Sequence, residues 1–148
     1  MRYAYPVQLE RDEGGHYLAT CRDVPEALTD GESQEEALRE MGDALGAALA
    51  GYVMEGRPIP SPTDPEPGEA IAPVSPLIAA KLALRVAMRA EGVSNSELAR
   101  RMGSHEGAIR RLIDVDHRSR IEAVHAAIAS LGHGLVVEDA RPFKPVAA

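Results

Sequence analysis

The sequence predicts an α+β fold in two parts: a small unit of strands with one long helix, followed by a mainly helical unit. Three observations support this prediction. Large apolar side chains occupy every second position over residues 3–9, as in a strand with one buried face. Apolar residues then recur in steps of three and four over residues 37–52, the spacing of an amphipathic helix. Seven of the eleven prolines lie within residues 58–76, and helical spacing resumes after them.

The first strand would place four apolar side chains on one face, those of Tyr3, Tyr5, Val7 and Leu9. Pro6 has no N–H to donate to a neighbouring strand, so we expect this strand to have an edge there. Residues 11–15 (RDEGG) predict a hairpin loop, because glycine readily adopts positive φ. A second strand is predicted over residues 16–21 and a short third strand over residues 26–30, with Asp23-Val24-Pro25 as the break between them.

A long helix is predicted after Ser33, which has the spacing of a capping box with Glu36. Gly56 and Pro58 end it. Its apolar stripe can cover one face of a three-stranded sheet and consists of Ala37, Leu38, Met41, Leu45, Ala48, Leu49 and Tyr52.

The proline-rich residues 58–76 predict an extended, fairly stiff linker. We therefore expect a first domain over residues 1–57, reaching to about residue 74 if residues 69–74 add a fourth strand in the order β-β-β-α-β. A second domain is expected over residues 77–140, and residues 141–148 would form a tail.

Within the second domain, residues 93–112 predict two short helices joined by a tight turn. Ser94 and Glu97 form a second potential capping box, and Gly103 provides a left-handed stop before a helix that begins near Ser104 or His105. Counted from Asn95, small or apolar residues fall at places five, nine, fifteen and eighteen, namely Ala99, Gly103, Ile109 and Leu112. This series resembles the helix-turn-helix of bacterial repressors, whose second helix enters the DNA major groove. An ordinary helical hairpin is the alternative.

The remaining segments of this domain would support the two short helices. Residues 77–90 have helix-forming composition, and Ser119 with Glu122 has the spacing of a third capping box, before a helix that ends at Gly132. Residues 134–138 (GLVVE) predict a short strand without a partner in its own domain, which would pair with its copy in a second subunit. We therefore expect a homodimer or a tetramer.

Charge is divided unevenly between the two halves. Residues 1–76 carry five arginines and no lysine against fifteen acidic side chains, a difference of −10. Residues 77–120 carry nine basic and five acidic side chains, a difference of +4, and they include the predicted helix-turn-helix. A basic segment at that place is suited to phosphate attraction, and the acidic half is suited to a basic partner, although solubility alone also explains it.

Several classes of protein are disfavoured. The single cysteine excludes an internal disulfide and suits a reducing cytoplasm, which is the location we expect. No apolar run approaches the ~18 residues of a membrane span, and the first residues lack the features of a signal peptide. Four acidic residues cluster in sequence, namely Asp23, Glu26, Asp30 and Glu32. They lie in a predicted turn and a short strand, and no basic segment that could bind RNA is near them. We therefore do not expect the protein to be an enzyme. The histidines and Cys21 have no recognised ligand spacing, so neither a metal nor another cofactor is expected.

The candidate DNA face lies on the second short helix and the turn before it. Its base-reading candidates are His105, Glu106, Gly107, Arg110 and Arg111, and its candidate backbone anchors are Ser94, Asn95 and Ser104. Arginine can bind guanine through two hydrogen bonds, and glutamate can accept one from cytosine. For Arg110 and Arg111 taken singly, a contact to phosphate alone is about equally plausible, since phosphate contacts are the majority class.

Motifs along nearly the whole chain resemble the HicB antitoxins of bacterial type II HicA–HicB toxin–antitoxin modules. The motifs are Tyr5-Pro6-Val7, Gly14-Gly15, Asp23-Val24-Pro25, Gly31, Glu35-Glu36-Ala37-Leu38, Ala79-Ala80-Lys81-Leu82, the helix-turn-helix, the segment from Asp114 to Ser119 and the final GLVVE. The resemblance implies a partial RNase-H-like domain that masks a small basic HicA-like toxin, an RNA-cleaving protein. It also implies a helix-turn-helix domain that represses the module's own promoter by binding operator DNA.

On this interpretation Asp23, Glu26 and Asp30 are the candidates for toxin contact, since a toxin that binds RNA should be basic. The alternative is a transcription regulator with the same DNA-binding domain, in which the first domain senses a small ligand or only oligomerises. A neighbouring reading frame for a small basic protein that co-purifies with this chain would distinguish the two.

Overall fold

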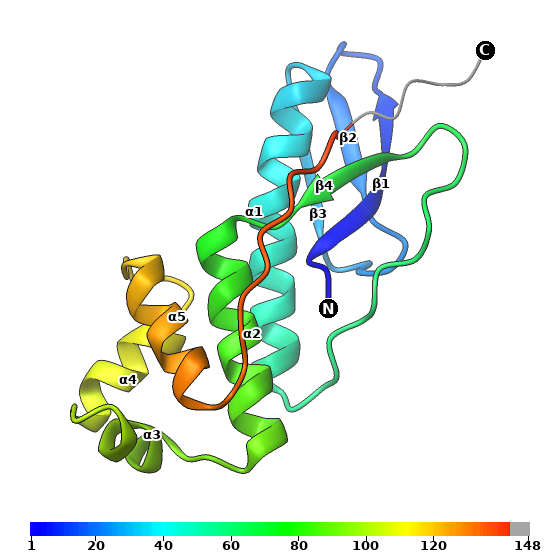
Figure 1. The fold of residues 1–148 in the computed structure, drawn as a ribbon. Helices are drawn as coiled ribbons and strands as arrows, with labels where there is room; N and C mark the ends of the chain where they lie inside the picture. The colour runs from blue at the N-terminus through cyan, green and yellow to red at the C-terminus, as the bar shows by residue number, and fades with distance from the viewer. Residues whose placement is uncertain (143–148) are drawn as a thin grey trace. The chain divides into compact units, whose positions relative to one another are not determined.

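The computed structural model describes residues 1–142 of the chain. In order, these residues form β1 (Ala4–Arg11), β2 (Tyr17–Thr20), β3 (Leu28–Gly31), α1 (Gln34–Met54), β4 (Ala70–Pro73), α2 (Pro76–Glu91), α3 (Asn95–Arg101), α4 (Glu106–Ile113) and α5 (Ile121–Ser130). Contacts between residues divide the chain into two compact units (Figure 1). The first unit is Met1–Ser75 with the described chain from Glu138 onward, and the second is Pro76–Val137.

The first unit is a four-stranded antiparallel sheet of order β3-β2-β1-β4 with α1 against one face (Figure 1). The first half of β1 pairs with β4, from Ala4 opposite Pro73 to Val7 opposite Ala70, and its second half pairs with β2. The predicted fourth strand is confirmed as Ala70–Pro73. The third strand is Leu28–Gly31, so it begins two residues later than predicted.

Pro6 lies where β1 has a local edge, as its missing N–H predicts. The Val74 N–H donates to the Tyr3 carbonyl oxygen (2.9 Å), so the backbone groups of the odd-numbered residues of β1 face β4. The nitrogen of Pro6 therefore faces the β2 side. Pairing with β2 ends at Gln8 opposite Thr20, so no strand is present there to need a donor from Pro6.

Helix α1 begins as its capping box predicts. The Ser33 Oγ accepts a hydrogen bond from the Glu36 N–H (3.1 Å), while the Glu36 carboxylate accepts one from the Glu32 N–H (2.7 Å), one residue before the cap. The buried stripe of α1 packs against the buried sheet residues Tyr5, Val7, Ala19, Ala70 and Ala72. Together these side chains form the core of the first unit.

The proline-rich segment, predicted as an extended and fairly stiff linker over residues 58–76, is grouped with the first unit as far as Ser75 and makes hydrogen bonds to it. The Tyr5 hydroxyl donates to the Pro60 carbonyl (2.8 Å), and the Asp23 carboxylate accepts from the Thr63 N–H (2.9 Å). Arg22 donates to the Asp64 carbonyl (2.7 Å). Composition predicts an extended backbone here, but it carries no information about the side chains, distant in sequence, that bind this backbone.

In the second unit, α2–α5 enclose a core that includes Ala80, Leu84, Met88, Leu98, Ala99, Ile109, Val124 and Ile128. Helices α3 and α4 form where the capping residues predict them. The Ser104 N–H donates to the Ala99 carbonyl (2.8 Å) and the Gly103 N–H to the Arg100 carbonyl (3.3 Å), with Gly103 at φ +61°. This is the Schellman pattern of a glycine-terminated helix, so the predicted stop is confirmed.

One local prediction in this unit is wrong. Ser119 does not cap α5, whose N-cap is Arg120 without a side-chain hydrogen bond. The Ser119 hydroxyl instead accepts a hydrogen bond from the Lys81 ammonium (2.9 Å), a partner that local spacing cannot reveal.

Residues 134–138 form no strand within one described chain, so their predicted pairing with a second copy stays a prediction. Val136 and Val137 are 93% and 83% exposed. A strand needs a neighbouring backbone to pair with, and this segment has none within one described chain. Its last residue, Glu138, pairs with Arg2 (3.0 Å), and farther on the Pro142 carbonyl accepts from the Ile71 N–H (2.7 Å). Of the predicted tail, residues 143–148 lie outside the described residues.

Candidate functional site

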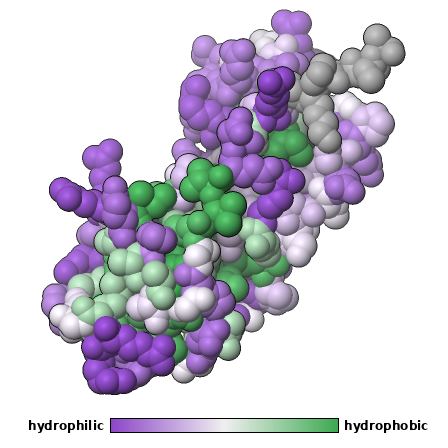
Figure 2. All heavy atoms as spheres, in the orientation of Figure 1, coloured by the Kyte–Doolittle hydropathy of each residue, from purple (hydrophilic) through white to green (hydrophobic). Residues whose placement is uncertain are grey.

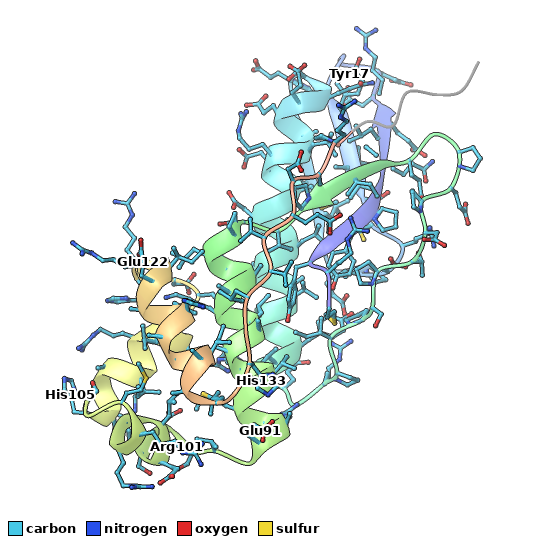
Figure 3. All side chains as sticks on the ribbon, viewed as in Figure 1. Tyr17, Glu91, Arg101, His105, Glu122 and His133 are labelled. Carbon is cyan, nitrogen blue, oxygen red and sulfur yellow. The ribbon has the colours of Figure 1, made fainter. Side chains whose placement is uncertain are left out.

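Ser94 and His105 both have a structural task at the start of a helix. The Ser94 Oγ accepts from the Glu97 N–H (3.2 Å), and the His105 Nδ1 accepts from the Ala108 N–H (3.2 Å). They are therefore the N-caps of α3 and α4, one before each arm of the helix pair. Figure 3 shows His105 at the start of α4. Ser104 is exposed in the turn and Asn95 is half-buried.

The exposed face of α4 carries the predicted base-reading side chains in adjacent positions. Glu106, Arg110 and Arg111 are exposed, and Gly107 is half-buried beside the His105 ring. Glu106 accepts a hydrogen bond from Arg110 (2.7 Å), one helical turn away. The structure thus brings the α4 candidates together, but Arg110 already has an acidic partner.

Helix α3 holds its own arginines in ion pairs. Arg100 donates two hydrogen bonds to the Glu97 carboxylate (2.9 and 2.8 Å), and Arg101 donates one (3.0 Å). These hydrogen bonds lower the pKa of Glu97 to about 2, so its charge is retained throughout the neutral range. Arg100 and Arg101 consequently share the one carboxylate of Glu97, so the three side chains together carry a net charge of +1.

The predicted DNA-binding site did not include Lys81, which lies behind the end of α4. It is 0% exposed, and its Nζ donates to the carbonyls of Arg111 (3.1 Å), Asp114 (2.6 Å) and His117 (2.6 Å) and to the Ser119 Oγ (2.9 Å). Burial lowers the pKa of Lys81, while the carboxylate of Asp114 acts in the opposite direction. The sequence contains a signal for this position, since Lys81 lies on the buried face of its helix, four residues after Leu77 and three before Leu84.

The same end of α4 receives a second cation from α2. The Arg85 Nε donates to the Ile113 carbonyl (3.1 Å). Arg85 and Lys81 are one turn apart on α2, and both bind carbonyls that the last turn of α4 leaves without helical partners. Positive groups are favoured at a helix C-terminus, so the two residues together fix the end of α4 and the chain after it.

The three acidic candidates of the first unit do not form one cluster. The Asp23 side chain is only 8% exposed and binds the backbone and the hydroxyl of Thr63. Glu26 accepts from the Tyr52 hydroxyl (2.6 Å), which lowers the pKa of Glu26, and it also pairs with Arg57. Only Asp30 is exposed on a strand. Within residues 1–142, no three His, Cys, Asp or Glu side chains are placed to hold a metal ion.

The sheet face opposite α1 is a candidate surface that the prediction missed. Strand register places Glu10, Leu18 and Asp30 in one row and Gln8, Thr20 and Leu28 in the next. Leu18 and Leu28 are 38% and 59% exposed, and Glu10 and Asp30 flank them. We call these six residues the open sheet face. Its apolar centre and acidic rim suit a protein partner with basic side chains.

A cavity of about 340 Å³ between α1 and β4 is the place in the first unit where a small ligand could bind. Its apolar wall includes Leu38, Ile71 and Pro73, and Glu35 and Asp43 lie at its acidic side. Within the described residues, no buried side-chain nitrogen or oxygen lacks a hydrogen-bond partner, so none is left unpaired there to orient a ligand. No helix in residues 1–142 has the length and apolarity to cross a membrane.

Comparison with known proteins adds a finding of another kind. Residues 4–83 match the family model described as HicB-like antitoxin of bacterial toxin–antitoxin system. Antitoxin HicB 2 of Photorhabdus laumondii is 40% identical over 131 residues, which cover 88% of this chain and 92% of that protein. Antitoxin HicB of Pseudomonas fluorescens is 34% identical over 136 residues, covering 91% and 92%. Antitoxin HicB of Escherichia coli K12 is 36% identical over 133 residues, covering 88% and 95%.

Proposed function

The chain belongs to the HicB-like family of bacterial antitoxins, and from this premise we propose that it has two activities. Its first unit binds and masks a small basic HicA-like toxin that cleaves RNA. Its second unit represses the chain's own operon by binding operator DNA. The observation that carries the proposal is the family membership. The similarity to these relatives covers 88% of this chain and so includes residues of both units.

For the first activity, the proposed contact surface is the open sheet face. Its two exposed leucines offer apolar area at the centre of an interface, and acidic side chains surround them. The first 76 residues have a charge difference of −10, which would speed association with a basic toxin. The proposed architecture of this unit is a partial RNase-H-like fold. The three acidic candidates are reassigned: Asp30 faces the toxin, while Asp23 and Glu26 hold the fold.

For the second activity, α3 and α4 act as a helix-turn-helix, with α4 in the major groove. Arg110 and Arg111 lie on its exposed face, and Ser94 and His105 present the starts of the two helices. One such motif contacts few bases, so two copies are needed for useful affinity. The exposed Val136 and Val137 are the proposed dimer contact, in which residues 134–138 of two copies pair as strands. The expected operator is a palindrome with half-sites about one helical turn, or a multiple of it, apart.

The proposed protein is not an enzyme. Asp23 is bound to Thr63, and Glu26 is bound to Tyr52 and Arg57. Among the described residues, no three His, Cys, Asp or Glu side chains converge as a two-metal nuclease would require. Purified protein should leave RNA and DNA intact in Mg²⁺ or Mn²⁺. Metal-dependent cleavage that disappears in Asp23→Ala would contradict this part of the proposal.

The proposal is tested by co-expressing the chain with the product of the adjacent reading frame. A small basic protein should co-purify with it, and growth arrest caused by that protein should be relieved. In parallel, the purified chain should shift a DNA fragment from its own promoter and not an unrelated fragment at the same concentration. A chain that binds the promoter but no neighbouring protein would favour the plain transcription regulator instead.

A further inference from the structure

The arginines of α3, of α4 and of the chain just after α4 fall into two groups, those with an acidic partner and those without one. Arg100 and Arg101 are bound to Glu97, and Arg110 is bound to Glu106. Arg111, Arg118 and Arg120 are exposed, and their side chains have no ion pair or hydrogen bond within residues 1–142. The arginines with free guanidinium groups therefore lie at the end of α4 and in the chain that follows it, not on α3.

This part of the chain, residues 111–120, is held by the buried ammonium of Lys81. Three of its four acceptors are backbone carbonyls at Arg111, Asp114 and His117, and the fourth is the Ser119 hydroxyl. In sequence, Arg118 lies between His117 and Ser119, which provide two of these acceptors. The end of α4 and the loop after it are thus tied to α2 at four points, while the side chains of Arg111, Arg118 and Arg120 are exposed. Because this backbone is already fixed, binding through its arginines requires little further loss of conformational entropy.

Figure 2 shows strongly hydrophilic side chains that stand out from the surface over the start of α5. Figure 3 shows nitrogen-bearing side chains that project beside Glu122, at the same place. Unpaired arginines on a fixed backbone are suited to phosphate oxygens, because binding breaks no existing ion pair and the guanidinium can donate two hydrogen bonds.

We propose that residues 111–120 form a phosphate-binding element in which Arg118 and Arg120, together with Arg111, contact the backbone of duplex DNA, and that Lys81 is the positioning residue that fixes this element. The inference rests on the proposed DNA-binding function of the second unit. It adds contacts by Arg118 and Arg120 outside the helix-turn-helix, and it assigns these two and Arg111, at the end of α4, to phosphate rather than to bases. The exposed Asp116 lies in the same loop, so its carboxylate opposes binding.

Equilibrium titrations of full-length protein test the contacts. Two fluorescent duplexes of equal length are used, one from the chain's own promoter and one of unrelated sequence, between 50 and 200 mM salt. Arg118→Ala and Arg120→Ala should each weaken binding to both duplexes by roughly five- to tenfold near 0.1 M salt. Each should also reduce the slope of log K against log salt by about 0.9, the value for one phosphate contact. Asp116→Asn should strengthen binding to both.

Arg100→Ala is the matched control, because it removes the same formal charge from a guanidinium already bound to Glu97. It should leave the slope close to that of the unchanged protein. If Arg118→Ala and Arg120→Ala behave like Arg100→Ala while the unchanged protein binds its promoter, the phosphate-binding element is wrong and the proposed DNA-binding function stands. If the unchanged protein binds neither duplex, the proposed DNA-binding function itself fails.

The role of Lys81 is tested by hydrogen exchange and DNA titration on the same samples. Lys81→Met should speed amide exchange in residues 111–120 and lower the salt slope as the arginine substitutions do. Ser119→Ala, which removes one acceptor and keeps three, should change both quantities in the same direction by less, and it remains informative if Lys81→Met unfolds the unit. Unchanged exchange and unchanged slope in both variants would overturn the positioning role.

Discussion

Lys81 is a charged residue buried in the second unit. Its ammonium is fully buried and binds carbonyl and hydroxyl oxygens rather than a carboxylate. Burial of a charge is costly unless hydrogen bonds replace its hydration, and four acceptors do so here. The same bonds give the His117 carbonyl a donor, and they add one to the Asp114 and Arg111 carbonyls, which also accept from the His117 N–H (3.2 Å) and the Ser119 hydroxyl (3.3 Å), respectively.

We therefore predict that Lys81→Met destabilises the second unit by on the order of 3 kcal/mol, because the hydrogen bonds of its ammonium to three carbonyls and one hydroxyl are all lost. Urea unfolding of the full chain, followed by circular dichroism in the helical region, measures the change. Val86→Met is the matched control, since Val86 is on the same helix and 44% exposed. Its effect should stay within about 0.5 kcal/mol. Equal midpoints for the two variants would contradict the prediction.

Glu97 gives a second prediction at the scale of one residue. Its pKa is lowered to about 2 by hydrogen bonds from Arg100 and Arg101. A carboxyl whose pKa is depressed on folding contributes stability above its unfolded value, and this contribution is lost as the pH falls toward the folded value. The carboxyl resonance of Glu97 should consequently titrate near pH 2 in the folded protein. Titration near the ordinary glutamate value would mean that the two arginines are not held, and would weaken the contrast with Arg118 and Arg120.

At the scale of an element, α1 shows that its glycines are not equivalent. A Cβ at Gly42 would lie 2.7 Å from the Pro73 carbonyl oxygen, so β4 approaches the helix backbone closely there. A Cβ at Gly51 would have no neighbour within 4 Å. Gly51→Ala should stabilise the fold by about 0.5–1 kcal/mol through helix propensity.

Gly42→Ala should instead destabilise the fold, since α1 or β4 would have to move. Thermal unfolding of the two variants beside the unchanged protein provides the measurement, with each variant serving as the control for the other. Stabilisation by both substitutions would show that β4 does not need the close approach at Gly42.

Element by element, the sequence predicts best what is decided locally. Ser33, Ser94 and Gly103 determine helix ends through hydrogen bonds to residues three to five positions away, and all three act as predicted. Ser119 has the same local spacing and fails, because Lys81, 38 residues away, binds its hydroxyl. The contacts of the proline-rich segment are not local either, since Tyr5 and Asp23 bind it from other elements.

The candidate sites follow the same rule. The α4 side chains were predictable because helical spacing puts them on one face. The acidic set of the first unit was not, because Tyr52 and Thr63 reach Glu26 and Asp23 from distant parts of the chain. The open sheet face depends on strand register, which the sequence of one strand does not reveal.

At the scale of the whole molecule, the two proposed activities use different units and opposite charge. The first half has a charge difference of −10 and the helical segment over residues 77–120 has one of +4. Each unit has its own buried core, so a surface change in one is not expected to unfold the other. A toxin surface and a DNA surface on separate units should therefore be separable by mutation, which is the central claim of the account.

The most direct test measures both activities on the same two double variants. Leu18→Lys with Leu28→Lys places positive charge on the open sheet face, where both leucines are exposed, and should abolish relief of toxin-induced growth arrest while promoter binding persists. Arg110→Ala with Arg111→Ala should reduce promoter binding by at least roughly tenfold, in line with 1–3 kcal/mol for a base contact, while growth is still rescued. Loss of both activities in either variant, or full rescue by the leucine variant, would contradict the account.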